Sequence, residues 1–282
     1  MSEHPVKTLP RLLTRYLVMQ EWLWSLLPAM IRNFDYFRIQ RNVGLEERFL
    51  TRCESVFANN CVIQGPFVGL RYASRKALGS AIYPKLVGSY ESELHVLLEK
   101  LLKKNYPLVI DIGFAEGYYL IGLGKRLPNA RLIGYDIDPS ANAICSELAK
   151  VNAVSMERCL LLKECIPSEL SDMLPCPSLI VCDCEGFEID LFTFQSKSLW
   201  KDSDLIIECH DFINPNTQDS IISVLTDTHK IHKIQSESSE TKLSFLDSSE
   251  FDSFSNEEKL RLVNEFRPTT QTWIVAESLQ TF

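Results

Sequence analysis

The sequence predicts an α/β fold in which a mostly parallel sheet carries helices on both faces and follows an N-terminal helical extension. Three observations lead to this prediction. Beyond Pro107, short apolar runs alternate with amphipathic stretches; a turn of small residues follows the first apolar run; and acidic residues follow two later runs. Regular alternation of strands and helices builds a parallel sheet, because each helix carries the chain back to the same edge.

The N-terminal part is expected to be helical. Apolar residues recur at helical spacing over residues 8–40, with Arg11, Arg15 and Glu21 interleaved. This helix either packs on the main domain or serves as a homodimer or membrane-surface helix, because tryptophan and arginine mix in such elements. We place the domain boundary at residue 82, so that residues 1–82 form an extension or cap.

The rest of the chain divides into a mixed segment and the alternating part. Residues 41–90 are expected to contain loops at 64–69 and 83–90, and residues 91–104 an amphipathic helix that ends in lysines, which suit a helix C-terminus. The expected strands are Leu108–Ile112, Arg131–Asp136, Cys159–Leu162, Leu179–Asp183, Leu205–Cys209, Lys230–Gln235 and Thr272–Ala276. The expected helices lie near 117–126, 139–151, 187–194, 216–227 and 256–265.

The composition is that of an ordinary globular protein of 282 residues, with 45% hydrophobic and 23% charged residues. A formal net charge of −8 argues against a role on nucleic acid, because proteins that bind phosphate backbones carry a basic face. The charge suits a small-molecule or glycan substrate better. The nine cysteines form no CxxC pair and predict reduced thiols in a cytoplasmic protein. No apolar run reaches the roughly 18 residues that a transmembrane helix requires.

The turn after the first strand of the alternating part is the strongest functional pattern. Residues 108–124, LVIDIGFAEGYYLIGLG, place Gly113, Ala115 and Gly117 between a strand and a helix. Small residues let the backbone approach a ligand, and free N–H groups at a helix start can hold an anion, here the carboxylate of S-adenosylmethionine. Asp111 is placed to orient the turn or to meet the ammonium group of that ligand.

An acidic residue at the end of the second strand completes this pattern. Asp136 stands 19 positions after Gly117, where a carboxylate accepts hydrogen bonds from ribose hydroxyls. Its alternative role is to cap the following helix, but Asp138, just before Pro139, suits the cap better. The residues expected to bind the cofactor are Asp111, Gly113, Ala115, Glu116, Gly117, Asp136, Ile137 and Asp183.

Two other functions remain open for the same turn. A dinucleotide-binding turn, and with it an NAD(P)-dependent oxidoreductase, would need glycine at 113, 115 and 118, whereas the chain has Ala115 and Tyr118. The bulky Tyr118 obstructs the close packing of helix on strand that the third glycine allows. The spacing therefore favours a methyl donor. A catalytically silent nucleoside-binding module would keep the turn but lack a working base.

Acidic residues and one histidine follow the fourth and fifth expected strands. In an open parallel sheet, ligands bind beyond the carboxyl ends of the strands. We expect His210 to act as the general base for a hydroxyl acceptor, because its unperturbed pKa lies near neutrality; it could instead be a structural histidine. Asp183 is the second candidate, and Glu208 could orient the histidine or the substrate. The residues of this cluster are Asp183, Glu185, Glu188, Glu208, His210 and Asp211.

Carboxylates and an imidazole at one edge could also bind Mg²⁺ or Mn²⁺, which would lower the pKa of a sugar hydroxyl. The possible ligands are Asp183, Glu185, Glu208 and His210. No Asp/Asn-Pro-Pro-Tyr/Phe segment, typical of enzymes that methylate amide or base nitrogens, follows the fourth strand. Oxygen is therefore the expected acceptor.

Several segments together resemble the FkbM-like branch of class I methyltransferases: VIDIGFAEGYYLIGLGKRLP, ARLIGYDIDPSA, LIVCDCEGFEIDLF and DLIIECHDF. The similarity covers roughly residues 83–278, and the Asp-x-Glu-Gly-x-Glu run from Asp183 to Glu188 is its most distinctive part. The resemblance implies a Rossmann-like, seven-stranded sheet with a reversed last strand over residues 83–282. It also implies S-adenosylmethionine as methyl donor and commonly a hydroxyl of a sugar or secondary metabolite as acceptor.

The same resemblance implies roles for single residues. Asp111, Gly113, Gly117 and Asp136 correspond to cofactor contacts, and Asp183 to the acidic residue beside the methyl group. Ala115 replaces a frequent middle glycine, and the ECHDF segment departs from a more variable fifth strand. Tyr90 and Glu91 form either a lid over the cofactor or the start of a helix with Ser89 as its cap.

Overall fold

The computed structural model describes residues 16–17, 19–26, 35–170, 174 and 177–280. The chain divides into two compact units. The larger comprises residues 59–248 and 259–282, and the smaller comprises residues 1–58 and 249–258. Residues 59–82 are thus grouped with the larger unit, while the expected role of residues 1–82 as an extension or cap stays a prediction.

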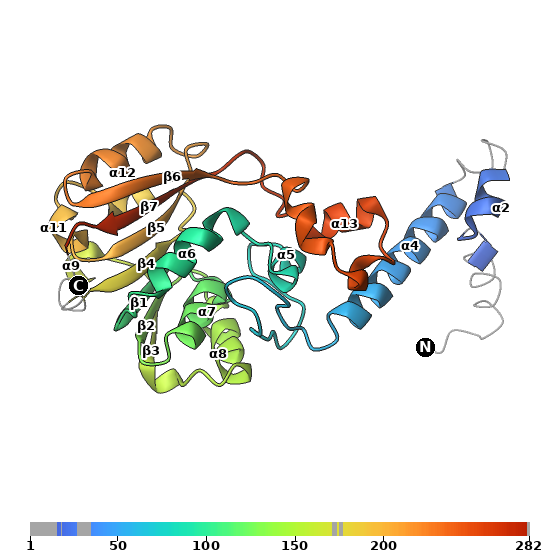
Figure 1. The fold of residues 1–282 in the computed structure, drawn as a ribbon, viewed down its shortest axis with the longest axis horizontal. Coiled ribbons are helices and arrows are strands. Elements are labelled where there is room, and N and C mark those ends of the chain that lie inside the picture. The colour runs from blue at the N-terminus through green and yellow to red at the C-terminus, as the bar shows by residue number, and fades with distance from the viewer. Residues whose placement is uncertain (1–15, 18, 27–34, 171–173, 175–176, 281–282) are drawn as a thin grey trace. The chain divides into compact units, whose positions relative to one another are not determined.

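The larger unit is built on a seven-stranded mixed sheet with the strand order β3-β2-β1-β4-β5-β7-β6 (Figure 1). Strands β1 to β5 pair in parallel, whereas β7 lies antiparallel between β5 and β6. This is a Rossmann-like sheet of seven strands with a reversed last strand, so the predicted fold class is confirmed. The strands are β1 (Leu108–Ile112), β2 (Arg131–Tyr135), β3 (Cys159–Leu162), β4 (Ser178–Cys182), β5 (Asp204–Cys209), β6 (His229–Gln235) and β7 (Thr272–Ser278).

Helices alternate with these strands as expected. The α-helices are α2 (Glu21–Leu26), α4 (Asp35–Val56), α5 (Ile82–Val87), α6 (His95–Leu102), α7 (Tyr118–Arg126), α8 (Ala141–Val151), α9 (Pro167–Leu170), α10 (Glu188–Leu191), α11 (Lys197–Trp200), α12 (Thr217–Leu225) and α13 (Asn256–Val263). The 3-10 helices are η2 (Ser92–Leu94), η3 (Met156–Arg158), η4 (Thr241–Leu246) and η5 (Ser249–Phe251).

Two expectations for the first hundred residues need correction. The loop expected at 83–90 is largely helix α5, because Pro84 falls in its first turn, where a missing N–H costs nothing. Gly88 then ends the helix in the left-handed conformation, with φ of 82°. The helix expected over 8–40 is described only as α2 and the start of α4, which continues to Val56. Residues 8–15, 18 and 27–34 of that prediction lie outside the described part.

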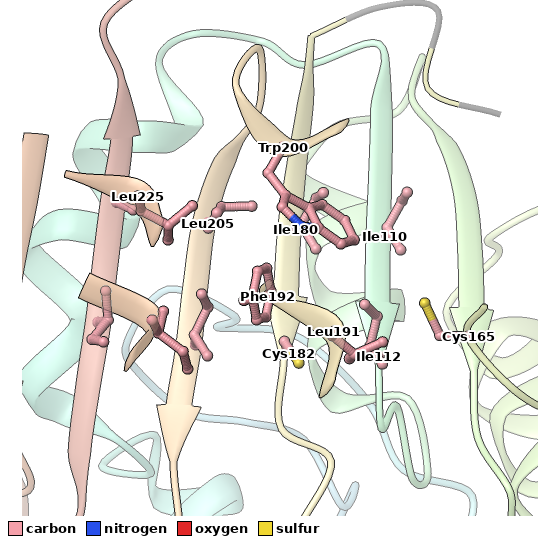
Figure 2. Packing of buried hydrophobic residues seen from close by; sticks show 14 of the residues in the cluster. Ile110, Ile112, Cys165, Ile180, Cys182, Leu191, Phe192, Trp200, Leu205 and Leu225 are labelled. Carbon is pink, nitrogen blue, oxygen red and sulfur yellow. The ribbon is translucent and has the colours of Figure 1, made fainter. Parts of the chain in front are cut away.

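The side chains of β1 alternate between two buried layers. Leu108, Ile110 and Ile112 join a cluster that includes Phe192 and Trp200 from the chain between β4 and β5 (Figure 2). The other face of the sheet packs on α7, which contacts β1 and β2. Because both faces are covered, every residue of β1 is buried, as is usual for a strand inside a parallel sheet.

The strand register brings the functional segments to one edge. Ile112, the last residue of β1, lies opposite Tyr135 of β2 and Cys182 of β4. The residues that follow these three strands therefore begin at the same level of the sheet. Cys182 in turn pairs with Ile207 of β5, so the end of β5 reaches this edge as well.

The smaller unit has an aromatic core of its own. Phe49 and Phe57 on α4 pack against Phe254 and Phe251, with ring centroids 6.0 and 6.3 Å apart. Arg52 pairs with Glu258 beside them. Among the described residues, no helix combines the length and apolar character needed to cross a bilayer. Homodimerisation through the N-terminal helix stays a prediction.

Candidate functional site

A cavity of about 940 Å³ lies at the carboxyl edge of the sheet. Its lining comes from the segments that follow β1, β2, β3, β4 and β5, together with residues 78–85 and 265–271. Nearly all of the residues predicted as site residues line it: Asp111, Gly113, Ala115, Glu116, Asp136, Ile137, Asp183, Glu185, Glu208 and His210. The topology therefore brings the two predicted clusters into one cavity.

The carboxylate of Asp136 is hydrogen-bonded to the turn after β1. Its Oδ2 accepts the N–H of Ala115 at 2.7 Å, and its Oδ1 accepts the N–H of Asp138 at 2.8 Å. The first bond depends on an unusual turn, in which Gly113, Ala115 and Gly117 all have positive φ, at 84°, 49° and 95°. A carboxylate offers about four lone-pair sites, so Asp136 keeps two for ribose hydroxyls.

Two N–H groups of the turn hold it against β2, while the binding of an anion by the N–H groups at the start of α7 stays a prediction. Gly113 and Phe114 donate to the carbonyl of Tyr135 at 2.7 and 3.3 Å, so these groups fasten the turn to β2 and are not free for a ligand. Asp111 accepts the N–H of Leu120 in the first turn of α7. An acidic residue at this position stabilises the positive end of the helix dipole.

Asp111 is 2% exposed, and its Oδ2 has no hydrogen-bond partner. Burial, assisted by the negative charges of Asp136 and Glu116, raises the pKa of Asp111 to about 8 although the bond from Leu120 opposes the shift. The neutral form of Asp111 is therefore favoured at the edge of the cavity, where it can donate as well as accept a hydrogen bond.

This pKa predicts a pH effect on stability. Because the folded-state pKa is raised, the neutral carboxyl contributes stability that is complete below its ordinary pKa of 3.8 and is lost as the pH rises towards about 8. Asp111→Asn cannot ionise, so its free energy of unfolding should rise relative to that of the wild type between about pH 5 and about pH 8.5. Urea unfolding of both proteins measures the difference.

Asp138 provides the control, because hydrogen bonds from Ser140 lower its pKa and place its titration below this window. Asp138→Asn should therefore leave the difference from the wild type constant over the same pH range. A constant difference for Asp111→Asn would contradict the assignment of a neutral carboxyl.

Gly117 and Tyr118 have packing roles that the sequence did not reveal. A Cβ on Gly117 would lie 2.7 Å from the Sγ of Cys145, so this glycine lets α7 approach α8. Gly117 lies outside the cavity lining, and its direct contact with a cofactor stays a prediction. Tyr118 packs edge-on against Phe67 and Tyr90, with centroids 5.0 and 5.3 Å apart.

Glu116 forms a buried ion pair with Lys85, a residue that sequence reasoning missed. Both side chains are at most 4% exposed, and Glu116 also accepts the N–H of Leu78 at 3.1 Å. The Lys85 ammonium lies 4.6 Å from the ring centroid of Tyr90 and donates to the hydroxyl of Ser80 at 2.7 Å. The pair therefore forms one wall of the cavity.

His210 lies among three carboxylates. Its Nδ1 is 2.9 Å from Oε1 of Glu188, while its Nε2 is 3.5 Å from Oδ1 of Asp183 and 3.4 Å from Oε2 of Glu185. The carboxylate that orients the imidazole is thus Glu188 and not Glu208, which corrects one of the roles expected for Glu208. Burial, together with the negative charges of Glu91 and Glu185, raises the pKa of Asp183 to about 7.

Glu208 belongs instead to a buried cluster around Arg267. The guanidinium of Arg267 donates to Glu208, to Glu91 at 2.8 Å and to Glu265 at 2.8 Å. Burial raises the pKa of Glu91 and of Glu208 to about 8, while the charge of Arg267 opposes the rise. No pattern in the sequence indicated Arg267, and Glu91 was expected only as part of a lid or of a helix start.

Asp183, Glu185 and His210 could hold a cation. One ligand atom from each lies within 4.8 Å of the others, although Glu185 is exposed and exposed carboxylates often gather without a metal. Glu208, the fourth possible ligand, is bound by Arg267. The Mg²⁺ or Mn²⁺ hypothesis stays a prediction.

Solved structures resemble this chain only distantly. An O-methyltransferase from Bacillus cereus in complex with SAH is 11% identical over 81% of this chain and 90% of its own, with a TM-score of 0.44. The O-methyltransferase TomG from Streptomyces achromogenes, in complex with SAM, is 14% identical over 68% and 81%, with a score of 0.43. A precorrin-6y C5,15-methyltransferase from Geobacter metallireducens is 13% identical over 65% and 88%, with a score of 0.42.

No protein-family model and no curated protein matches the chain. With identities and scores this low, we draw no conclusion about function from the structural neighbours.

Proposed function

We propose that the protein is an S-adenosylmethionine-dependent methyltransferase that transfers a methyl group to a hydroxyl of a sugar, glycan or small metabolite. One observation carries the proposal: the Asp136 carboxylate accepts the N–H of Ala115 in the same cavity that reaches His210. A nucleoside held by Asp136 would therefore share its cavity with a candidate base.

The walls of the cavity near Asp136 suit a nucleoside. Asp136 retains lone pairs for the ribose, and Ile137 beside it is 74% exposed, which leaves an apolar surface for the adenine ring. Tyr118 argues against a dinucleotide, since its aromatic neighbours fill the position where the third glycine would allow close packing. S-adenosylmethionine, when bound, would supply an electrophilic methyl group whose sulfur departs with the bonding electron pair.

The opposite part of the cavity suits a hydroxyl acceptor. A hydroxyl is a weak nucleophile and gains from a base within hydrogen-bond reach. His210 and Asp183 line this part, and Phe187 and Phe212 beside them are 47% and 50% exposed. Half-exposed rings next to carboxylates offer both an apolar face and hydrogen-bond acceptors, as a sugar ring requires. The FkbM-like resemblance supports the same class of acceptor.

Isothermal titration with S-adenosylhomocysteine and with NAD⁺ tests the cofactor. We expect S-adenosylhomocysteine to bind and NAD⁺ not to bind. Asp136→Asn should weaken the affinity about 10- to 100-fold, because hydrogen bonds to a charged group contribute about 1.5–3 kcal/mol. Asp227→Asn, at an exposed carboxylate paired with Lys197, should leave it unchanged. Tight NAD⁺ binding would instead favour an oxidoreductase.

A silent nucleoside-binding module would pass that test, so the chemistry needs its own measurement. We expect the wild type to transfer methyl groups to a member of a glycan and metabolite panel. His210→Ala should reduce turnover by about 10²- to 10⁴-fold, the usual contribution of a general base. Turnover equal to that of the wild type in both His210→Ala and Asp183→Ala would remove this assignment.

A further inference from the structure

The side chain of His210 is hydrogen-bonded to a carboxylate that does not line the cavity. Its Nδ1 lies 2.9 Å from Oε1 of Glu188, and the two side chains are 4% and 0% exposed. His210 lines the cavity, whereas Glu188, in the first turn of α10, lies outside the lining. The contact between them is therefore shielded from solvent and from any substrate.

The remaining partners of Glu188 fix the direction of this hydrogen bond. Oε1 of Glu188 also accepts the N–H groups of Cys184 and Gly186, at 3.2 and 3.1 Å. An oxygen that already accepts two backbone N–H groups carries no proton to donate, so Nδ1 of His210 has to donate its proton to it. In the neutral imidazole, Nε2 is then left without a proton and becomes the acceptor.

This acceptor nitrogen points towards the cavity. Nε2 lies 3.5 Å from Oδ1 of Asp183 and 3.4 Å from Oε2 of Glu185, beyond the usual length of a hydrogen bond. Oδ1 of Asp183 is itself buried without a hydrogen-bond partner. The Asp183 side chain is 30% exposed and lines the same cavity as His210, so a hydroxyl that donates to Nε2 would lie beside it.

We propose that Glu188 is a positioning residue that holds His210 as the Nδ1–H tautomer and so presents Nε2 as the base towards an acceptor hydroxyl beside Asp183. This inference rests on the proposed function and deepens it by naming the group that prepares the base. When the acceptor oxygen forms its bond to the methyl carbon, its O–H bond breaks and the proton moves to Nε2. Glu188 stays ionised and stabilises the imidazolium that results.

The charges around His210 agree with this role. Glu188 faces the imidazole from α10, Asp183 and Glu185 from the segment after β4, and Glu208 from β5, where Arg267 binds it. Burial alone lowers the pKa of His210, but the hydrogen bond and charge of Glu188, together with the charges of Glu208 and Glu185, outweigh burial and leave the pKa raised. Burial likewise raises the pKa of Glu188, and its bond with His210 reverses that shift.

Nuclear magnetic resonance of ¹⁵N-labelled histidine tests this arrangement and needs no methyl-acceptor substrate. The chain has five histidines, and His210→Asn identifies the signal of interest. We expect the neutral form of His210 to be the Nδ1–H tautomer. In Glu188→Gln the amide oxygen still accepts that hydrogen bond, so the tautomer should persist while the pKa of His210 falls by about one unit or more.

Glu185→Gln is the matched control, since it removes a carboxylate at a similar distance that is 75% exposed and therefore screened. It should change the pKa of His210 by less than about half a unit. An Nε2–H tautomer in the wild type, or equal pKa changes in the two variants, would overturn the proposal. The tautomer of the wild type decides the case even where Glu188→Gln does not fold.

The same spectra distinguish this proposal from a metal site at His210, and a separate titration distinguishes it from the proposed function. A metal bound at Nε2 would occupy the base, so a displaced Nε2 chemical shift in equimolar Mg²⁺, a diamagnetic ion, would also overturn it. Titration with S-adenosylhomocysteine reports on the proposed function independently: loss of that binding with the Nδ1–H tautomer intact would contradict the methyltransferase assignment and leave the Glu188–His210 geometry standing.

Discussion

Gly113→Ala is expected to destabilise the protein by about 3 kcal/mol or more and to abolish binding of S-adenosylhomocysteine. A Cβ on Gly113 would lie 1.7 Å from the carbonyl oxygen of Asp183, a backbone atom that cannot turn away. The φ of 84° at Gly113 adds the cost of a left-handed conformation for a residue with a side chain. Relief of this clash must separate the segments after β1 and β4, which lie side by side and both line the cavity.

Gly69→Ala separates the steric clash of the Cβ from the cost of the left-handed backbone conformation. Gly69 has a φ of 81°, but a Cβ there would meet only the ammonium of Lys125 at 3.6 Å, an ordinary contact. This variant should therefore lose about 1–2 kcal/mol, the conformational cost alone, and should bind S-adenosylhomocysteine as the wild type does. Urea unfolding and isothermal titration measure both effects. Equal stability of the two variants would show that the turn after β1 can move freely.

The strands could be predicted because their patterns are local. All seven expected strands are present with ends within two residues of the observed ones, since each is a short apolar run bounded by polar or turn residues. The closeness of Asp136 to the turn after β1 could be predicted as well, because parallel strands place their carboxyl ends at one edge of the sheet. Helix α5 was missed because Pro84 and Gly88 suggest a loop, although both are compatible with a helix at these positions.

The charged partners could not be predicted because no local pattern joins them. Arg267 lies 59 positions from Glu208 and 176 from Glu91, and only the folded chain brings them together. Glu188 was visible in the acidic run, but its role depends on the first turn of α10, which aims its carboxylate back at the end of β5. The prediction therefore identified the acidic edge and misassigned which carboxylate orients the histidine.

The Arg267 cluster also explains how so many acids share one cavity. Glu91 takes the left-handed conformation, with φ of 50°, and its carboxylate accepts a hydrogen bond from the hydroxyl of Tyr119 as well as from Arg267. A strained backbone at a buried charge persists only where surrounding contacts hold it. Arg267 supplies these contacts to two other chain segments at once, so the cation organises the part of the cavity that Glu208 lines.

Arg267→Leu is accordingly expected to lose about 3–5 kcal/mol of stability, because it leaves Glu91 and Glu208 buried without their cation, whereas Glu265 keeps Lys242. The loss should be larger at about pH 8.5 than at about pH 6. The reason is that Glu91 and Glu208, whose pKa values of about 8 rise further without the guanidinium, can stay neutral at the lower pH. Their neutral forms contribute stability that is lost as the pH rises through those values.

Arg126→Leu provides the comparison for this loss. Arg126 also binds a carboxylate, here the single group of Glu99 through two hydrogen bonds of 2.6 and 2.8 Å, but the side chains are 36% and 45% exposed. Solvent screens such a pair, so its removal should cost no more than about 1 kcal/mol. Urea unfolding at both pH values compares the variants. Similar losses for Arg267→Leu and Arg126→Leu would mean that the buried acids are satisfied without Arg267, and that other contacts organise this part of the cavity.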